Sequence, residues 1–272
     1  MLTDLETDRD AAERGQLTGS AAEVYEAFFV PALFGQFAGP VAEAAGARLG
    51  ERFLDVACGT GVLARAAAAK GARATGVDCN SGMLAVARKK SHEIHWQEGR
   101  AEALPLEDYS FRAVGCQFGL MFFDDRVAAL REMWRVLAPG GRMAVAVWDR
   151  AETSPGYAAM IALIERLFGA TVADALRTPF VLGDVTELAG LFEAAALDGV
   201  QIETVPGTAR FPSIEDWVRT DVKGWTLADL IDEAGYAELQ AAAHRELACF
   251  AGAAGDVGFA APAHVAVVMK RR

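Results

Sequence analysis

A buried strand that ends in a glycine turn constrains the fold of this chain more than any other feature. Residues 53–57 (FLDVA) predict a short apolar strand, residues 58–61 (CGTG) a tight turn, and residues 62–69 an alanine-rich helix. Glycines allow a sharp turn and the close approach of a ligand to backbone amides at a helix N-terminus. With Ala64, the turn fits G-x-G-x-x-A, a pattern of dinucleotide-binding folds that is weak on its own.

Strands continue to alternate with helices downstream. Ser81 is expected to cap the helix that begins at Met83, and the sequence from Asp184 to Glu187 resembles a capping box. The alternation predicts a doubly wound α/β fold with a seven-stranded, mostly parallel sheet. Further strands are expected at 74–78, 94–97, 113–117, 143–148, 200–205 and 264–269, and further helices at 83–90, 127–137 and 184–195.

The remaining segments are predicted to surround that core. Aromatic residues around Pro31 and Pro40 predict two or three short helices near the N-terminus. The stretches between the later strands are longer than plain connections, so we expect them to be structured. The predicted organisation is 1–50 as an N-terminal tail and helical lid, 51–150 as the ligand-binding core, 151–183 as a helical insertion, 184–205 as core continuation, 206–255 as a second helical insertion that forms a cap, and 256–272 as the final core strand.

Charge and composition argue against several functional classes. The chain has 26 basic and 37 acidic residues, a net charge of −11, so it repels phosphate backbones and is not expected to bind nucleic acid. Its longest uncharged stretch, 27–42, is too short to span a membrane, and its acidic beginning is unlike a secretion signal. The four cysteines are scattered, so we expect no metal site and a reducing, cytoplasmic location.

Asp78 narrows the class of ligand that the glycine turn suggests, because it lies at the end of the second predicted strand. A carboxylate in that position accepts hydrogen bonds from the ribose hydroxyls of an adenosine-containing ligand. The glycine turn and Asp78 together therefore predict such a ligand. An adenosine-binding oxidoreductase satisfies both features as well and stays open on them alone.

Four motifs, in the right order and spacing, resemble those of class I S-adenosylmethionine-dependent methyltransferases. The resemblance is strongest to the small-molecule branch that includes the ubiquinone/menaquinone biosynthesis C-methyltransferases. It implies a Rossmann-like fold, methyltransferase activity, S-adenosyl-L-methionine as cofactor and S-adenosyl-L-homocysteine as product. A nicotinamide-dependent enzyme is not expected to show the LAPGG turn. The motifs are LDVACGTG at 54–61, GVD at 76–78, GRAEALPLEDYSF at 99–111 and LREMWRVLAPGGRMAVAVW at 130–148.

The resemblance also assigns cofactor-binding residues. It implies that the glycine loop lies along the methionine end of the cofactor, that Asp55 places the ammonium directly or through water, and that Asp78 takes the ribose. Met83 is expected to pack on adenine, and Ala101 to offer its backbone amide to it. The complete implied set is Tyr25, Asp55, Gly59, Thr60, Gly61, Asp78, Cys79, Met83, Ala101, Glu102 and Gln117.

Two positions depart from the family pattern. Arg100 stands where relatives commonly have an aspartate that accepts from the adenine amine, and arginine has no acceptor. Either Glu102 or a backbone carbonyl is expected to replace it. Arg112 stands where aspartate often follows the phenylalanine. Arg100 keeps open the alternative of a cofactor-binding regulatory or structural homologue without methyl transfer.

Methyl transfer demands little chemistry from the protein. Holding the acceptor and the methyl group in line accelerates the displacement, and a general base is needed only if the acceptor must lose a proton. No catalytic residue is assigned; the candidates are Tyr25 on the lid, Gln117 at the end of the fourth strand and His264 in the last strand. The sequence after Gln117 lacks the Asn/Asp-Pro-Pro-Tyr pattern of enzymes that methylate base amines, which again argues against nucleic acid.

The lid and the insertions carry more apolar bulk than the sheet needs. We expect part of it to form core or a homodimer interface. The remainder should enclose a small, largely apolar, aromatic or polyketide-like acceptor, methylated on an O, N or C atom. The residues concerned are Tyr25, Phe28, Phe29, Phe34 and Phe37 in the lid, and Tyr157, Met160, Ile161, Ile164, Leu167, Phe168, Phe211, Trp217, Trp225 and Leu227 in the insertions.

Overall fold

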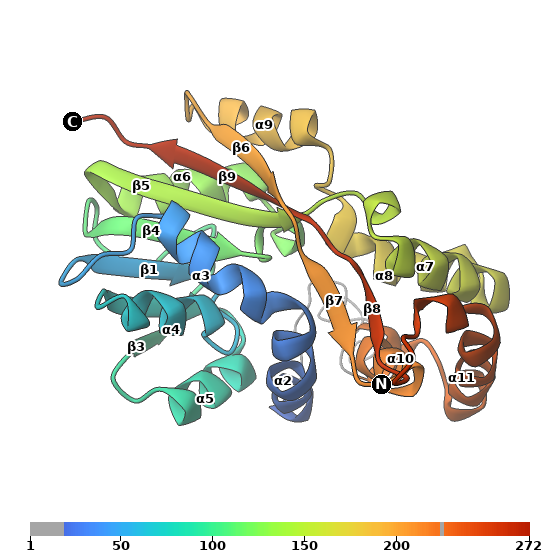
Figure 1. The fold of residues 1–272 in the computed structure, drawn as a ribbon. Coiled ribbons are helices and arrows are strands. Elements are labelled where there is room, and N and C mark those ends of the chain that lie inside the picture. The colour runs from blue at the N-terminus through green and yellow to red at the C-terminus, as the bar shows by residue number, and fades with distance from the viewer. Residues whose placement is uncertain (1–18, 224–225) are drawn as a thin grey trace, which may run out of the picture.

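A seven-stranded sheet forms the centre of the molecule (Figure 1), in a computed structural model that describes residues 19–223 and 226–272. The strand order is β3-β2-β1-β4-β5-β9-β6, and β9 runs antiparallel to both of its neighbours while the other pairs are parallel. This confirms the predicted doubly wound, mostly parallel sheet. Its strands are β1 (Arg52–Val56), β2 (Arg73–Asp78), β3 (His95–Glu98), β4 (Phe111–Gln117), β5 (Leu137–Trp148), β6 (Gln201–Val205) and β9 (Ala263–Met269).

Helices cover both faces of this sheet (Figure 1). Helix α3 packs against α4 on one face, and α6 packs against α9 on the other. Because both faces are covered, the central strands are buried almost end to end, which explains their continuous apolar sequences. The core helices are α3 (Gly35–Ala44), α4 (Val62–Ala69), α5 (Ser81–Lys90), α6 (Arg126–Val136) and α9 (Val185–Ala194).

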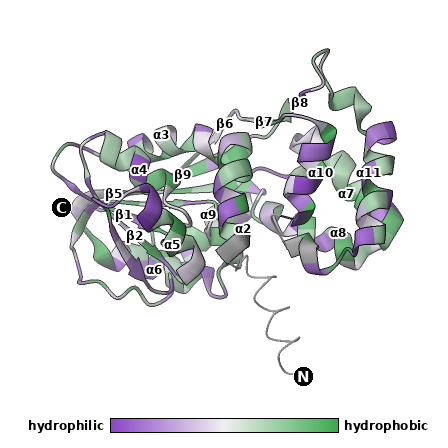
Figure 2. Ribbon diagram, turned by 90° about the horizontal axis from the view of Figure 1, so that it is seen from below, coloured by the Kyte–Doolittle hydropathy of each residue, from purple (hydrophilic) through white to green (hydrophobic). Residues whose placement is uncertain are grey.

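A helical lobe lies beyond the carboxyl ends of the parallel strands (Figures 1 and 2). Two short strands, β7 (Thr208–Phe211) and β8 (Val257–Ala260), pair antiparallel and lead from the sheet into this lobe. The sequence predicts 206–255 as helical and does not reveal β7, because four residues are too few for an alternating pattern to stand out. The lobe's helices are α7 (Pro155–Phe168), α8 (Ala170–Arg177), α10 (Ile214–Lys223) and α11 (Glu233–Glu246), joined by the short segments η3 (Ala151–Thr153), η4 (Thr178–Phe180), η5 (Thr226–Asp229) and η6 (Ala248–Phe250).

The N-terminal lid is one continuous helical segment. It consists of α2 (Gly19–Val24), the π-helix η1 (Tyr25–Phe34) and α3. Pro31 lies inside η1 and cannot donate a backbone hydrogen bond, and the Gly35 N–H reaches back to the Val30 carbonyl. Stretches of π-helix are rare and often occur at functional sites. The first part of the predicted tail and lid, residues 1–18, lies outside the described residues.

The helix caps and the start of β5 confirm one prediction from the sequence and correct two others. Asp184 caps α9 as predicted, since its Oδ1 accepts the Thr186 and Glu187 N–H groups. Helix α5 is capped by Asn80, whose Oδ1 accepts the Met83 N–H at 3.1 Å, so the prediction of Ser81 as the cap is wrong. Strand β5 begins at the LAPGG turn, earlier than predicted, and its pairing with β4 is irregular there.

Candidate functional site

The glycine turn after β1 forms the base of the candidate site. Gly59 and Gly61 have φ angles of 53° and 86°, and a Cβ on Gly61 would lie 2.2 Å from the Trp96 ring. Gly61 occupies the capping position before α4 but has no side chain that can cap the helix. The Oδ2 atom of Asp55 takes that role and accepts the Ala64 N–H at 2.8 Å. Asp55 therefore ties strand β1 to the first turn of α4.

Asp78, at the end of β2, is joined to the same turn. Its Oδ2 accepts the Gly59 N–H and its Oδ1 accepts the Asn80 N–H, each at 2.8 Å. A carboxylate has about four acceptor positions, so Asp78 retains capacity for further hydrogen bonds. Burial raises the pKa of Asp78, and the backbone hydrogen bonds oppose this shift. Burial also raises the pKa of Asp55, to about 8.

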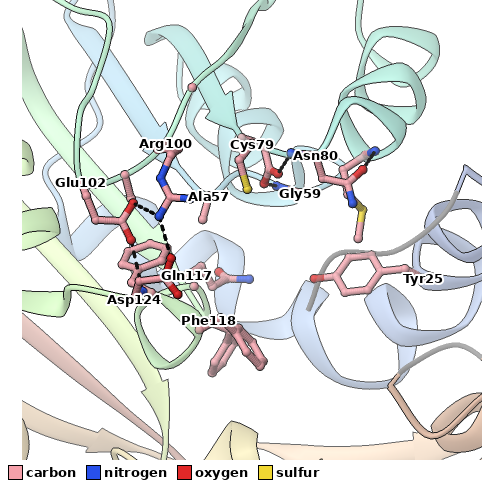
Figure 3. A pocket seen from close by; sticks show the side chains of 17 residues that line it. Tyr25, Ala57, Gly59, Cys79, Asn80, Arg100, Glu102, Gln117, Phe118 and Asp124 are labelled. Carbon is pink, nitrogen blue, oxygen red and sulfur yellow. Dashed lines mark hydrogen bonds and ion pairs between the residues drawn. The ribbon is translucent and has the colours of Figure 1, made fainter. Parts of the chain in front are cut away.

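A cavity opens in front of the glycine turn (Figure 3). Most of the residues assigned to the cofactor line it. Asp55, Thr60 and Gly61 do not line it, but they shape the turn behind it. The individual cofactor contacts stay predictions. The lining residues are Tyr25, Ala57, Gly59, Asp78, Cys79, Asn80, Met83, Gly99, Arg100, Ala101, Glu102, Gln117, Phe118, Gly119, Phe122, Phe123 and Asp124.

Tyr25 closes one side of this cavity from the lid (Figure 3). It begins the π-helix η1, and its ring stacks on Phe34 with 5.1 Å between the ring centroids. Burial, together with the negative charge of Asp78, raises the pKa of the Tyr25 hydroxyl. The hydroxyl therefore keeps its proton at neutral pH and is able to donate a hydrogen bond into the cavity.

Glu26 anchors the lid to the glycine turn, a role that the sequence alone does not reveal. Its Oε2 accepts from the Thr60 hydroxyl at 2.5 Å, and its Oε1 lies 3.0 Å from the Arg65 guanidinium and 3.4 Å from the Lys90 ammonium. The Glu26 side chain is only 10% exposed, so these partners compensate for the removal of its charge from water. No local motif signals this role, because all three partners lie far along the chain.

Arg100 lies at the rim of the cavity and is held by two acids (Figure 3). Its guanidinium is 2.8 Å from the Asp124 carboxylate and 3.4 Å from that of Glu102. The hydrogen bond to Asp124 and the charge of Glu102 raise the pKa of Arg100. Glu102 also accepts the Asp124 N–H, at 3.2 Å. Arg100 has no acceptor itself, but it fixes two carboxylates on the cavity wall.

Gln117, at the end of β4, supplies an acceptor without a partner. Its Nε2 donates to the Phe34 carbonyl at 3.2 Å, while its Oε1 is buried and has no hydrogen-bond partner among the residues that the structure describes. Buried acceptors are normally satisfied, so this atom marks a position for a donor on a ligand. The spare acceptors of Gln117 and Asp78 and the apolar surface of Met83 fit the amine, ribose and adenine of S-adenosylmethionine.

His264 lies outside the candidate site. Its Nε2 is 3.1 Å from the Gly183 carbonyl and 3.1 Å from the Asp149 carboxylate, and its Nδ1 is 2.9 Å from the Thr204 hydroxyl. Both ring nitrogens are thus engaged, and the side chain is 3% exposed. His264 does not line the cavity, so its place in the structure favours a structural role over that of a base.

A second, mainly aromatic pocket adjoins the first. Tyr25, Phe118 and Phe122 line both. Phe118 has a φ of 56°, an uncommon conformation for a bulky residue and one that is frequent at functional sites, and its ring stacks on Trp148 at 4.0 Å. The other lining residues are Phe29, Leu33, Phe34, Trp148, Tyr157, Leu176, Pro179, Phe180 and Asp221.

The acceptor residues expected from sequence are only partly found in this aromatic pocket. Tyr157 of α7 lines it, together with residues from the lid. Trp217 does not line it, because it is fully buried against Phe211 and Phe259 in the core of the helical lobe. Trp225 lies outside the described residues.

This fold and the cavity at the carboxyl ends of its strands are those of class I S-adenosylmethionine-dependent methyltransferases, and comparison with known proteins agrees. A family described as a methyltransferase domain matches residues 54–145. The demethylmenaquinone methyltransferase of Staphylococcus haemolyticus is 34% identical over 178 residues, which cover 59% of this chain and 74% of that protein. The chain therefore belongs to the S-adenosylmethionine-dependent methyltransferase family, with demethylmenaquinone methyltransferases among its relatives.

The extent of the similarity varies between relatives. The demethylmenaquinone methyltransferase of Chlorobaculum parvum is 48% identical over 91 residues, which cover 33% of this chain but only 38% of that protein. Among solved structures, phosphoethanolamine N-methyltransferase 2 of Haemonchus contortus, in complex with S-adenosyl-L-methionine, superposes with a TM-score of 0.62. It is 19% identical, with 97% of this chain and 60% of that chain covered, and so shows the fold alone.

Two further kinds of feature are absent from the described residues. None of the helices within 19–223 and 226–272 has the length and apolar character needed to cross a membrane. In the same part of the chain, no three histidine, cysteine, aspartate or glutamate side chains gather as a metal site would require.

Proposed function

We propose that this protein is an enzyme that transfers a methyl group from S-adenosyl-L-methionine to an O, N or C atom of a small, largely apolar, aromatic or polyketide-like acceptor. The observation that carries the proposal is the junction of the two pockets. The polar cavity contains Asp78 and the aromatic pocket lies next to it, and Tyr25, Phe118 and Phe122 belong to both. A donor in the first pocket and an acceptor in the second would meet at these shared residues.

The residues of the polar cavity would hold the cofactor by hydrogen bonds and packing. When bound, S-adenosyl-L-methionine supplies a methyl group on a sulfonium that is a good leaving group. Asp78 would accept from the ribose hydroxyls, Gln117 Oε1 from a donor at the methionine end, and Met83 would cover the adenine. The glycine turn allows the backbone to lie close to the ligand.

The shared aromatic residues would position the reacting groups. Tyr25, Phe118 and Phe122 present aromatic surface where the pockets meet, and the faces of aromatic rings attract cationic groups such as a sulfonium. They also exclude water and hold an apolar acceptor in line, which contributes most of the acceleration expected for a displacement of this kind. Tyr25 and Gln117 stay candidates for direct contact with the reacting atoms.

A transfer assay separates this proposal from the alternative, a cofactor-binding homologue without methyl transfer. Protein and S-adenosyl-L-methionine labelled in the methyl group are incubated with a panel of naphthols, hydroxyquinones and polyketide-like phenols. Demethylmenaquinone, the substrate in the relatives' names, is the first compound to test. Label in an organic extract supports the proposal. Tight binding of S-adenosylhomocysteine, with no labelled product from any acceptor, would favour the alternative.

The remaining expectations about partners also stay proposals. A net charge of −11 supports a small-molecule acceptor over nucleic acid. A homodimer is proposed only from the apolar bulk of the chain, and light scattering coupled to size-exclusion chromatography measures it directly.

A further inference from the structure

A buried carboxyl lies in the wall of the otherwise mainly apolar aromatic pocket. Asp221, on helix α10, is 2% exposed and lines this pocket. Its Oδ1 is 3.5 Å from the Tyr157 hydroxyl, at the outer limit of a hydrogen bond. Its Oδ2 is buried and has no hydrogen-bond partner among the described residues. Asp221 therefore has an acceptor that the protein itself leaves unsatisfied.

An unsatisfied buried carboxyl is costly, so a purely structural role explains it poorly. Leaving a buried polar group unpaired costs about 1–3 kcal/mol, and more if the group is charged. Burial raises the pKa of Asp221 to about 8, and its two polar neighbours, Trp217 and Tyr157, lower it only in part. A residue retained only for packing would avoid this cost. A ligand that completes its hydrogen bonds would remove it.

Asp221 and Tyr157 lie on the part of the aromatic pocket that is not shared with the cofactor cavity. Both line the aromatic pocket and neither lines the cavity around Asp78. The shared residues, such as Phe118 and Phe122, mark the end where the methyl group would arrive. An acceptor placed there would direct its other end toward Asp221.

We propose that Asp221, with Tyr157 beside it, binds a hydroxyl or amino group of the acceptor at the end of the molecule away from the methylated atom. This inference rests on the proposed function. It makes Asp221 a specificity-determining residue: an acceptor with a hydrogen-bond donor at that end satisfies the carboxyl, and a purely hydrocarbon analogue leaves it unpaired. Sites built to hydrogen-bond a ligand group discriminate strongly against analogues that lack that group.

Matched aromatic probes test the proposal. Naphthalene, 1-naphthol and 1-naphthylamine have the same ring system and differ in the polar group, and the last two distinguish a hydroxyl from an amine. Their affinities are measured by fluorescence titration with saturating S-adenosylhomocysteine present, so that the cofactor cavity is filled. We expect the wild type to bind 1-naphthol or 1-naphthylamine about tenfold more tightly than naphthalene. Equal affinities for all three would overturn the inference.

Two variants test whether Asp221 causes the preference for the polar probe. Asp221→Leu removes both oxygens and should abolish the preference for the polar probe. Thr220→Val is the control, because Thr220 is also buried on α10 but bonds to the Asp216 carbonyl and does not line the pocket. It should keep the preference. A preference that survives in Asp221→Leu contradicts the inference.

A milder variant keeps the test decisive if Asp221→Leu does not fold. Asp221→Asn has nearly the same shape but replaces one carboxyl oxygen by an NH2 group that cannot accept a hydrogen bond, so its preference should fall about threefold, and an unchanged preference contradicts the inference. Binding of S-adenosylhomocysteine is measured first for each protein. Failure of the wild type to bind it would contradict the proposed function, whereas normal binding without any preference among the probes contradicts only the role of Asp221.

Discussion

Two carboxylates with similar burial have different roles at the residue scale. Asp78 is held by the Gly59 and Asn80 amides beside the cofactor cavity, while Asp221 stands in the aromatic pocket with one oxygen unpaired among the described residues. The first is visible in the sequence, because an acid at the end of the second strand is a local signal. The second is not, because only the packing of α10 against the lid and the lobe gives Asp221 its neighbours.

Replacing Asp78 by alanine should weaken cofactor binding by roughly ten- to a hundredfold. Hydrogen bonds from ribose hydroxyls to this carboxylate would be worth about 1.5–3 kcal/mol, and the change also removes the acceptor that fixes the Gly59 amide. Calorimetric titration with S-adenosylhomocysteine measures the affinity. Asp198→Ala, at an exposed position, is the control. Unchanged affinity in a folded Asp78→Ala protein would show that the ribose binds elsewhere.

The stability of the Asp221→Asn protein relative to wild type should depend on pH. The pKa of Asp221 is about 8 in the folded protein against an ordinary value of 3.8, so the folded state holds the proton more tightly. The proton's contribution to the free energy of unfolding is fully present below about pH 4, and it is lost as the pH rises through about 8. Asparagine does not titrate. Over about pH 5 to 8, the free energy of unfolding of the variant should therefore rise relative to that of wild type by roughly 1.4 kcal/mol for each pH unit.

Urea unfolding of both proteins at several pH values measures this difference. Asp55, whose pKa is also raised to about 8, is present in both and cancels from the comparison. A difference that stays constant over that pH range would mean that Asp221 is not protonated in the folded protein.

At the scale of elements, the lid and the glycine turn act together. The π-helix η1 places Tyr25 over the cavity, and the adjacent Glu26 bonds to Thr60 behind the turn and pairs with Arg65 on α4. The motifs of the core strands and turns follow from local sequence, which is why β1, β2, β4 and the capping of α9 are predictable. The π-helix, the Glu26 contacts and the β7–β8 pair depend on partners distant in sequence, so no short pattern reveals them.

Glu26→Ala should loosen the lid. Removing this nearly buried carboxylate leaves the Thr60 hydroxyl and two cations without their partner, so hydrogen exchange in residues 25–34 should accelerate by about tenfold. The affinity for S-adenosylhomocysteine should fall several-fold, because Tyr25 is less well held. Glu23→Ala is the matched control, since Glu23 is 63% exposed and its ion pair with Lys89 lies at the surface. Equal effects of the two substitutions would refute the anchoring role of Glu26.

At the scale of the whole molecule, the candidate site lies between the central sheet and the helical lobe. The doubly wound sheet supplies most of the cavity around Asp78 at the carboxyl ends of its strands, and the helical lobe supplies one wall of the aromatic pocket (Figures 1 and 2). The sequence predicts the sheet well, because its motifs lie almost entirely in the stretch, residues 54–145, that matches a methyltransferase domain. It predicts the helical and apolar character of the lobe, but not which side chains face the pocket. Trp217 illustrates this limit, since its place in the core of the lobe depends on three-dimensional packing.

A crystal structure of the protein with S-adenosylhomocysteine tests the central claim, that the two pockets form one continuous methyl-transfer site. The account predicts the ribose hydroxyls on Asp78 and the sulfur atom at the junction formed by Tyr25, Phe118 and Phe122, facing the aromatic pocket. A ligand bound elsewhere, or a sulfur atom directed away from those three residues, would contradict it.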